Sequence, residues 1–309
     1  MATVHSIATQ RTLSSPSLRP FESTKSLPIY QKTIAHKVSC QGIGVHSGLP
    51  VTLTLYPTFS GNGITFIRTD LGGKEVKANW QTVVDTCMCT TIGNNQGITV
   101  STIEHLMAAL AAHGIDNVRV ELNGPELPIM DGSASPFMRL LEEAGVKHQQ
   151  TPRKLIRVLK KVTVENGGQK ASLSPSSSYE IEVEFDFAGR IPFQSQNFTF
   201  RPFKDSFEED IAPARTFGLL EDAQKIWERG LAKGASLDNT LVYEGAQVLN
   251  EDGTRYTDEC VRHKVLDVLG DLHLAGGLIL GKFHGIRPGH TLHSQLLHAL
   301  FADSTAWEG

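Results

Sequence analysis

The feature that most constrains the fold is an order of secondary-structure patterns that occurs twice along the chain. Each half begins with strands whose hydrophobic residues alternate, then continues with a helix, one more strand and a second helix. In the first half these segments are 51–55, 64–67, 101–112, 118–122 and 135–144. In the second half they are 155–158, 162–164, 171–173, 181–187, 257–275, 278–284 and 292–301. The repetition predicts an α+β fold of two similarly folded domains, each a two-layer α/β sandwich.

Domain boundaries follow from length and from breaks in these patterns. The 309 residues are enough for two domains of about 100–200 residues each. The polar stretch 147–154 separates the two pattern sets, which predicts domains at 29–150 and 151–309. A helix is expected at 221–229, inside an insertion near 217–241 that is long enough to line a binding channel.

Composition restricts the partners and the compartment. A net charge of -4 gives no global field for nucleic acid, and no apolar run approaches the roughly 20 residues that cross a bilayer. Four scattered cysteines are too few for a disulfide framework, which favours a reducing, cytoplasmic setting. Residues 1–28 are rich in Ser, Thr and Pro and read as a disordered extension, with an organellar transit segment as the alternative.

The second-half helix carries a polar stripe that fits a metal site. His263, Asp267 and Asp271 are spaced at i, i+4 and i+8, so their side chains project from one face. A solvated helix face is the alternative, but two aspartates at i, i+4 repel each other by a few tenths of a kcal/mol there. A bound cation reverses the sign of that interaction, and His with Asp at this spacing is a common ligand pair.

The first-half helix supplies the ligand that the stripe lacks. Glu104 and His105 lie side by side at its start. In the alternative interpretation, Ser101 and Glu104 form a capping box and His105 is merely packed. Two histidines and one carboxylate match the catalytic zinc pattern, which leaves a fourth position for water, and an adjacent carboxylate is the expected general base. His290 follows a tight turn and, held by Asp271, is a candidate acid.

Several longer motifs resemble a known family. They are GIGVHSG at 42–48, STIEHLMAAL at 101–110, PIMDGSA at 128–134, ARTFG at 214–218, LNEDG at 249–253 and RHKVLDVLGD at 262–271. In this order, over residues 31–307, they closely resemble UDP-3-O-acyl-N-acetylglucosamine deacetylase, the zinc amidase of lipid A biosynthesis. The resemblance implies zinc ligands His105, His263 and Asp267, with Glu104 as the base that activates water.

The same resemblance implies further roles around the metal. His290 corresponds to the residue that stabilises the oxyanion and protonates the leaving amine, and Asp271 to the carboxylate that orients it. Thr216 corresponds to a hydroxyl donor to the oxyanion. Lys264 corresponds to a lysine that contacts substrate phosphate, and Phe217 lies where the substrate site begins.

The implied reaction is hydrolysis of the 2-acetamido group of a UDP-linked, 3-O-acylated glucosamine, which releases acetate and a free amine. The implied active site lies between the two domains, and the insertion forms a βαβ unit that gives the acyl chain a hydrophobic passage. The loop 189–196 departs from the family pattern, so the preferred acyl length does not follow. A monomer is compatible with the sequence.

Three other interpretations of the chain differ in what they predict. A binding module with the same fold would hold zinc without releasing acetate. A zinc amidase for another acylated amino sugar would not depend on the UDP group or on the 3-O-acyl chain. A structural protein would be insensitive to chelation.

Overall fold

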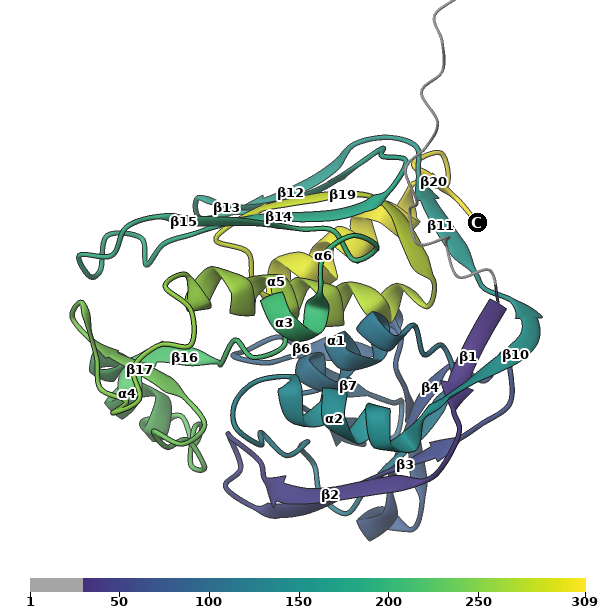
Figure 1. Ribbon diagram of the computed structural model, residues 1–309, viewed down its shortest axis with the longest axis horizontal. Coiled ribbons are helices and arrows are strands. Elements are labelled where there is room, and N and C mark those ends of the chain that lie inside the picture. The colour runs from purple at the N-terminus through teal and green to yellow at the C-terminus, as the bar shows by residue number, and fades with distance from the viewer. Residues whose placement is uncertain (1–29) are drawn as a thin grey trace, which may run out of the picture.

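The computed structural model describes residues 30–309, so the expected N-terminal extension lies outside the described part of the chain. Figure 1 shows four layers: a sheet, a layer with helices α5 and α6, a layer with α1 and α2, and a second sheet. The helix layers face each other in the middle of the molecule. The predicted α+β class is therefore confirmed.

A five-stranded sheet and two helices make up the first half. The strands are hydrogen-bonded in the order β2 (Val38–Ile43), β3 (Pro50–Pro57), β9 (Val118–Leu122), β4 (Ile64–Arg68) and β5 (Lys74–Lys77). The helices are α1 (Glu104–His113) and α2 (Ser135–Ala144). Only the pair β4 and β9 is parallel.

The second half repeats this topology. Its strands pair in the order β12 (Val162–Asn166), β13 (Gln169–Ser174), β19 (Leu278–Ile286), β14 (Tyr179–Phe185) and β15 (Gln196–Phe200). Its helices are α5 (Glu259–Leu272), continued by the 3-10 turn η3 (His273–Ala275), and α6 (His290–Ala302). Among these five strands again only one pair, β14 and β19, is parallel, and β11 (Leu155–Val158) adds to the same sheet by pairing in parallel with β19. The two halves are thus similarly folded, as the repeated sequence pattern predicts.

Each half also contains a pair formed by its first and last strands. One pair lies before the expected domain boundary near residue 150 and the other after it. The first and last strands of the first half, β1 (Tyr30–Ile34) and β10 (Val146–Pro152), pair antiparallel. The first and last strands of the second half, β11 (Leu155–Val158) and β20 (Trp307–Glu308), do the same. The polar stretch 147–154, expected only to separate the domains, is therefore mostly strand β10. A division near residue 150 fits this arrangement and stays a prediction.

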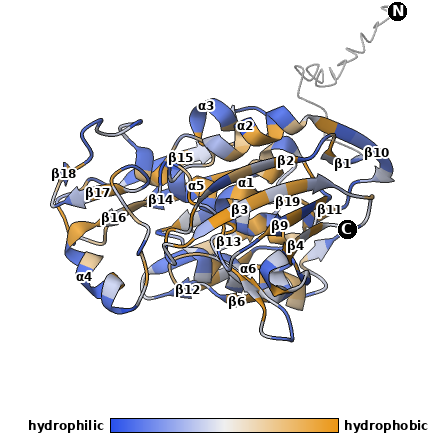
Figure 2. Cartoon of the chain, turned by 90° about the horizontal axis from the view of Figure 1, so that it is seen from below, coloured by the Kyte–Doolittle hydropathy of each residue, from blue (hydrophilic) through white to orange (hydrophobic). Residues whose placement is uncertain are grey.

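The burial of each element explains which secondary-structure patterns could be predicted from the sequence. Strands β3 and β9 alternate buried residues with half-buried or exposed ones because one face of their sheet covers helices. Helix α1 is buried over residues 104–110 and α5 over most of its length, because each lies between a sheet and the other helix. In Figure 2 the hydrophobic residues gather along the central strands and helices, whereas β10 is hydrophilic.

The predicted insertion is a small separate layer. Strands β16 (Phe217–Leu219) and β17 (Leu241–Glu244) pair in parallel, with helix α4 (Leu220–Glu228) between them in the chain, which confirms the βαβ unit. Strand β18 (Gln247–Val248) adds a third, antiparallel strand. Figure 1 places this unit beside the edge where the two helix layers meet.

Short elements that the sequence did not predict fill the connections. They are the sheet of β6 (Val83–Asp85), β7 (Thr91–Gly93) and β8 (Thr99–Val100), the short helix α3 (Phe207–Asp210) and the 3-10 turns η1 (Thr69–Leu71) and η2 (Trp80–Thr82). Within residues 30–309, no helix combines the length and the apolar character needed to cross a membrane.

Candidate active site

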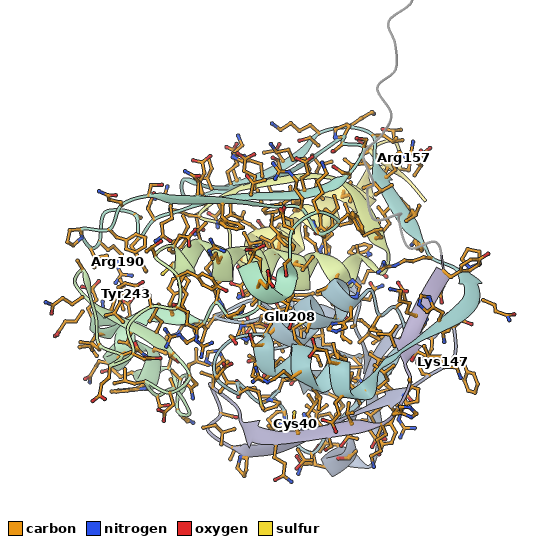
Figure 3. All side chains as sticks on the ribbon, viewed as in Figure 1. Cys40, Lys147, Arg157, Arg190, Glu208 and Tyr243 are labelled. Carbon is orange, nitrogen blue, oxygen red and sulfur yellow. The ribbon has the colours of Figure 1, made fainter. Side chains whose placement is uncertain are left out.

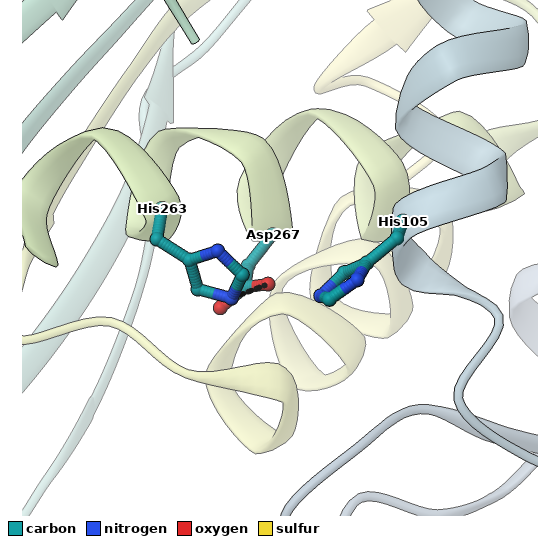
Figure 4. A group of neighbouring side chains, drawn as sticks. All are labelled: His105, His263 and Asp267. Carbon is teal, nitrogen blue, oxygen red and sulfur yellow. Dashed lines mark ion pairs between the residues drawn. The ribbon is translucent and has the colours of Figure 1, made fainter. Parts of the chain in front are cut away.

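Two helices from different halves bring the predicted metal ligands together. His105 is the second residue of α1, while His263 and Asp267 lie one turn apart on α5. One ligand atom from each of the three residues lies within 4.8 Å of the other two. All three residues are at most 4% exposed. Figure 4 shows the two imidazoles and the carboxylate converging on one point between the helices.

Hydrogen bonds hold one polar atom each of His263 and Asp267 and leave the other atom of each residue free. His263 Nδ1 donates to the Ala214 carbonyl at 3.0 Å, which leaves Nε2 facing Asp267 Oδ1 at 3.5 Å. Lys264 Nζ donates to Asp267 Oδ2 at 2.8 Å. His105 Nδ1 and Asp267 Oδ1 are buried with no hydrogen-bond partner in residues 30–309. Buried polar atoms without a partner cost about 1–3 kcal/mol each, so this arrangement fits a cation.

The protonation states of the trio also suit a cation. Burial lowers the pKa of His105 to about 3 and lowers the pKa of His263, so both imidazoles are neutral near pH 7. Burial would raise the pKa of Asp267, but Lys264 and His263 outweigh it and hold that pKa below its usual range. Neutral imidazoles and an ionised carboxylate are the forms that bind metal.

Glu104 stands beside the trio as the first residue of α1. The capping-box interpretation of this residue is wrong. The N-cap is Ile103, and no side chain caps the helix. Thr102 has a φ of 57°, which keeps Ser101 outside the helix. Glu104 Oε2 instead accepts from the Thr90 amide at 3.1 Å. Burial raises the pKa of Glu104 to about 8, with a contribution from nearby carboxylates.

The other predicted catalytic pair lies next to Glu104. His290 Nδ1 donates to Asp271 Oδ2 at 2.7 Å, and His290 Nε2 lies 3.9 Å from Glu104 Oε1. Burial alone would lower the pKa of His290, but the Asp271 carboxylate outweighs it and raises that pKa to about 9. At neutral pH the site therefore holds a protonated imidazole 3.9 Å from a carboxyl group whose affinity for a proton is raised.

Two residues of this cluster were not predicted from the sequence. Thr90 Oγ1 donates to Asp271 Oδ1 at 2.6 Å, and His293 Nδ1 donates to Asp271 Oδ2 at 2.7 Å. Asp271 thus accepts from Thr90, His290 and His293. His293 is i+3 from His290, and that helical spacing is the one signal in the sequence that could have paired the two histidines. Thr90 carries no such signal.

The predicted substrate residues lie on the insertion side of the trio. The Phe217 ring is 5.9 Å from the His263 ring, and Lys264 Nζ lies 5.3 Å above the Phe217 ring. Lys264 is paired with Asp267 within the chain. The Thr216 amide donates to the Gly132 carbonyl at 2.8 Å. Among the described residues no hydrogen bond joins the Thr216 hydroxyl to Glu104 or His290.

A buried arginine fixes the segment that carries Thr216 and Phe217. Arg215 Nε donates to Glu259 Oε1 at 2.9 Å, and its Nη2 donates to the Gly253 carbonyl at 2.6 Å. Both side chains of the Arg215–Glu259 pair are almost fully buried. Because Glu259 is the first residue of α5, this pair anchors the segment 214–217 to the helix of two predicted ligands.

The fold and the site together define a class: an α+β protein of two similarly folded halves with a buried histidine–carboxylate cluster between them. Residues 31–302 match the sequence profile of the family described as UDP-3-O-acyl N-acetylglycosamine deacetylase, and the chain belongs to that family. Relatives named UDP-3-O-acyl-N-acetylglucosamine deacetylase include proteins of Shewanella baltica, 45% identical, and Shewanella oneidensis, 44% identical. Both alignments cover 91% of this chain and 92% of the relative.

Proposed function

We propose that the protein hydrolyses the 2-acetamido group of UDP-3-O-acyl-N-acetylglucosamine in a zinc-dependent reaction of lipid A biosynthesis. The products are acetate and UDP-3-O-acyl-glucosamine. Membership of the deacetylase family supports the reaction class. The observation that carries the mechanism is the juxtaposition of three converging ligand atoms with Glu104 and His290 in one buried cluster.

His105, His263 and Asp267 would hold the zinc ion. Their free, buried atoms and their protonation states support this assignment. Bound there, Zn²⁺ would supply Lewis-acid activation of the amide carbonyl and of the attacking water. The Ala214 carbonyl orients the His263 ring, as carbonyls often do for zinc-binding histidines.

The chain's own residues would then move the protons. Glu104, with its raised pKa, accepts a proton as water attacks the carbonyl carbon and the new C–O bond forms. Protonated His290 and the Thr216 hydroxyl donate to the developing oxyanion. As the C–N bond breaks, His290 gives its proton to the leaving amine, while Asp271 keeps its ring oriented.

Substrate contacts would come from the insertion side. Lys264 lies over Phe217 beside the ligand trio, where a phosphate of the UDP group would meet a positive charge. The βαβ unit of β16, α4 and β17 would provide the apolar passage for the 3-O-acyl chain. A monomeric state and a cytoplasmic setting remain predictions from the sequence.

An acetate-release assay on the UDP-linked acylated sugar tests this proposal, with metal content measured on the same sample. We expect stoichiometric zinc and acetate release that stops on chelation and returns when zinc is added. Stoichiometric zinc without acetate release would identify a binding module instead. Equal rates on sugars that lack the UDP group or the acyl chain would identify an amidase with another substrate.

A further inference from the structure

A cavity lies beside the C-terminal turn of α1, the opposite end of that helix from Glu104. Its volume is about 430 Å³, within the size range of small-molecule sites. The first half contributes the C-terminal turn of α1 and strand β1, and the second half contributes the C-terminal part of α5 and the segment 200–208. None of the proposed catalytic or ligand residues lines this cavity.

One wall of the cavity is apolar and comes from both halves. Leu269 and Leu272 of α5 lie beside Phe200 at the end of β15 and Phe207 of α3, and all four are at least nine-tenths buried. Ala111 of α1 closes the wall with a small side chain. An aliphatic chain seated against this wall would remove apolar surface from water at about 25 cal/mol per Å².

The opposite end of the cavity is cationic. A Cβ atom built on Gly114 would lie 3.4 Å from both Lys32 Nζ and Arg153 Nη1, so these two positive groups converge on one place. One carboxylate, Asp116, serves both residues: it accepts from Arg153 Nε at 2.7 Å and from the Lys32 amide at 2.9 Å. The Arg153 side chain is 4% exposed, yet within residues 30–309 its two terminal nitrogens donate no hydrogen bond.

Two cations thus lie beside one carboxylate at this end, and Lys32 Nζ also donates to the His113 carbonyl at 3.4 Å. Burial and Arg153 lower the pKa of Lys32. The other charged residues that line the cavity, Lys204, Asp205 and Glu208, belong to the segment 200–208, where Asp205 accepts from the Arg201 amide at 2.7 Å. Figure 3 shows Glu208 on α3, in front of the place where the helix layers meet.

We propose that this cavity binds a small amphiphile with one anionic head and an aliphatic chain. The head, a carboxylate or a phosphate, accepts hydrogen bonds from Lys32 and the free nitrogens of Arg153. The chain lies against the apolar wall. Because the ligand touches α1 at Ala111 and α5 at Leu269, it bridges the two helices that carry the proposed active-site residues.

Calorimetric titration of the full chain with decanoate, decyl phosphate and decanol tests this site. We expect one molecule of decanoate or decyl phosphate per chain, and about tenfold weaker binding of decanol, which lacks the charge. The stronger of the two anions identifies the natural head group as carboxylate or phosphate. Lys32→Gln should weaken anion binding about tenfold through loss of one charged donor.

Ala111→Leu fills the cavity without a change in charge and should also weaken binding about tenfold. Lys147→Gln is the matched control, since Lys147 is exposed on β10 (Figure 3), opposite Thr33 of β1, and outside the cavity. The Lys147→Gln variant should bind the anions as tightly as the unaltered chain does. The proposal fails if no anion binds, or if Phe217→Ala abolishes binding while Lys32→Gln and Ala111→Leu leave it intact, because the ligand then occupies the proposed acyl passage.

Discussion

Glu104 and His290 lie 3.9 Å apart in a cluster that is largely closed to water, and their pKa values are raised for different reasons. Burial raises the pKa of Glu104, whereas Asp271 raises the pKa of His290 against the effect of burial. In its ionised form Glu104 is therefore a stronger base than an ordinary carboxylate, and His290 stays protonated at neutral pH. In the proposed reaction the pair would supply both proton-transfer functions that amide hydrolysis requires.

Replacement of the proposed base tests this division of roles. Glu104→Gln keeps an oxygen that can accept from the Thr90 amide but removes the basic carboxylate. We expect kcat to fall by about two to four orders of magnitude, with zinc content unchanged. Glu142→Gln, at an exposed position of α2, is the control and should retain full activity. An active Glu104→Gln enzyme would remove Glu104 from the mechanism.

His293 supports the active site through Asp271. The residue is fully buried, and its Nδ1 donates to the same Asp271 oxygen as His290. His293→Leu removes that donor and should lower the free energy of unfolding by about 1–3 kcal/mol, measured by urea denaturation. His293→Asn keeps an N–H group at a similar position and should recover part of the loss. Equal stability of the two variants would show that the hydrogen bond is not what His293 contributes.

The sequence predicts those site residues whose spacing or motif lies within a short stretch of the chain. His263 and Asp267 follow from one helical turn, and both lie on one face of α5 as predicted. Thr90 escaped because its contacts with Glu104 and Asp271 join segments 14 and 181 residues apart. Such contacts depend on how the two halves pack, and no pattern within a short window reports them.

At the scale of elements, the contact between α1 and α5 sets the geometry of the site. Gly270 lies where the two helices approach most closely: a Cβ added there would be 2.1 Å from the Glu104 carbonyl oxygen. That oxygen belongs to the backbone, so the helices would have to separate. Since Glu104 and His105 are on α1 and the other two ligands are on α5, any separation pulls the ligand trio apart.

Gly270→Ala should therefore reduce both stability and activity. We expect the free energy of unfolding to fall by about 1–3 kcal/mol, the usual cost of overpacking, and zinc affinity to fall with it. Urea denaturation and metal analysis measure the two effects. Gly218→Ala is the matched control for stability, because nothing lies within 4 Å of the added Cβ and its φ is not positive. Unchanged stability of both variants would show that the close approach of α1 and α5 at Gly270 does not limit the stability of the fold.

Elements were predictable where burial imposes a period on the sequence. The helix α2 and the strand β11 begin and end at the predicted residues, because each has one buried face. Strand β10 was missed because six of its seven residues are exposed, which leaves no alternation to detect. The start of α1 was placed too early because Ser101 resembles a helix cap, whereas in the fold it bridges to Glu126.

At the scale of the whole molecule, the duplication explains where the site lies. Helix α1 precedes the central strand β9 of its half, and α5 precedes the equivalent strand β19 of the other. The two equivalent helices pack against each other, so a cluster at their contact draws ligands from both halves. A metal bound there links the halves directly, and its binding free energy adds to the stability of the whole fold.

Metal removal should therefore destabilise the entire molecule. At zinc concentrations about 100 times Kd, binding adds about 2.7 kcal/mol, which for a chain of this length corresponds to a Tm increase of roughly 4–5 °C. We expect chelation to lower Tm by this amount and added zinc to restore it, as followed by calorimetry. His105→Ala on α1 and His263→Ala on α5 should each lose zinc and abolish the shift, since either half alone holds an incomplete ligand set. His148→Ala, at an exposed position of β10, should keep both the zinc and the Tm shift. Stoichiometric zinc in either ligand variant would place the ion elsewhere and remove that histidine from the set.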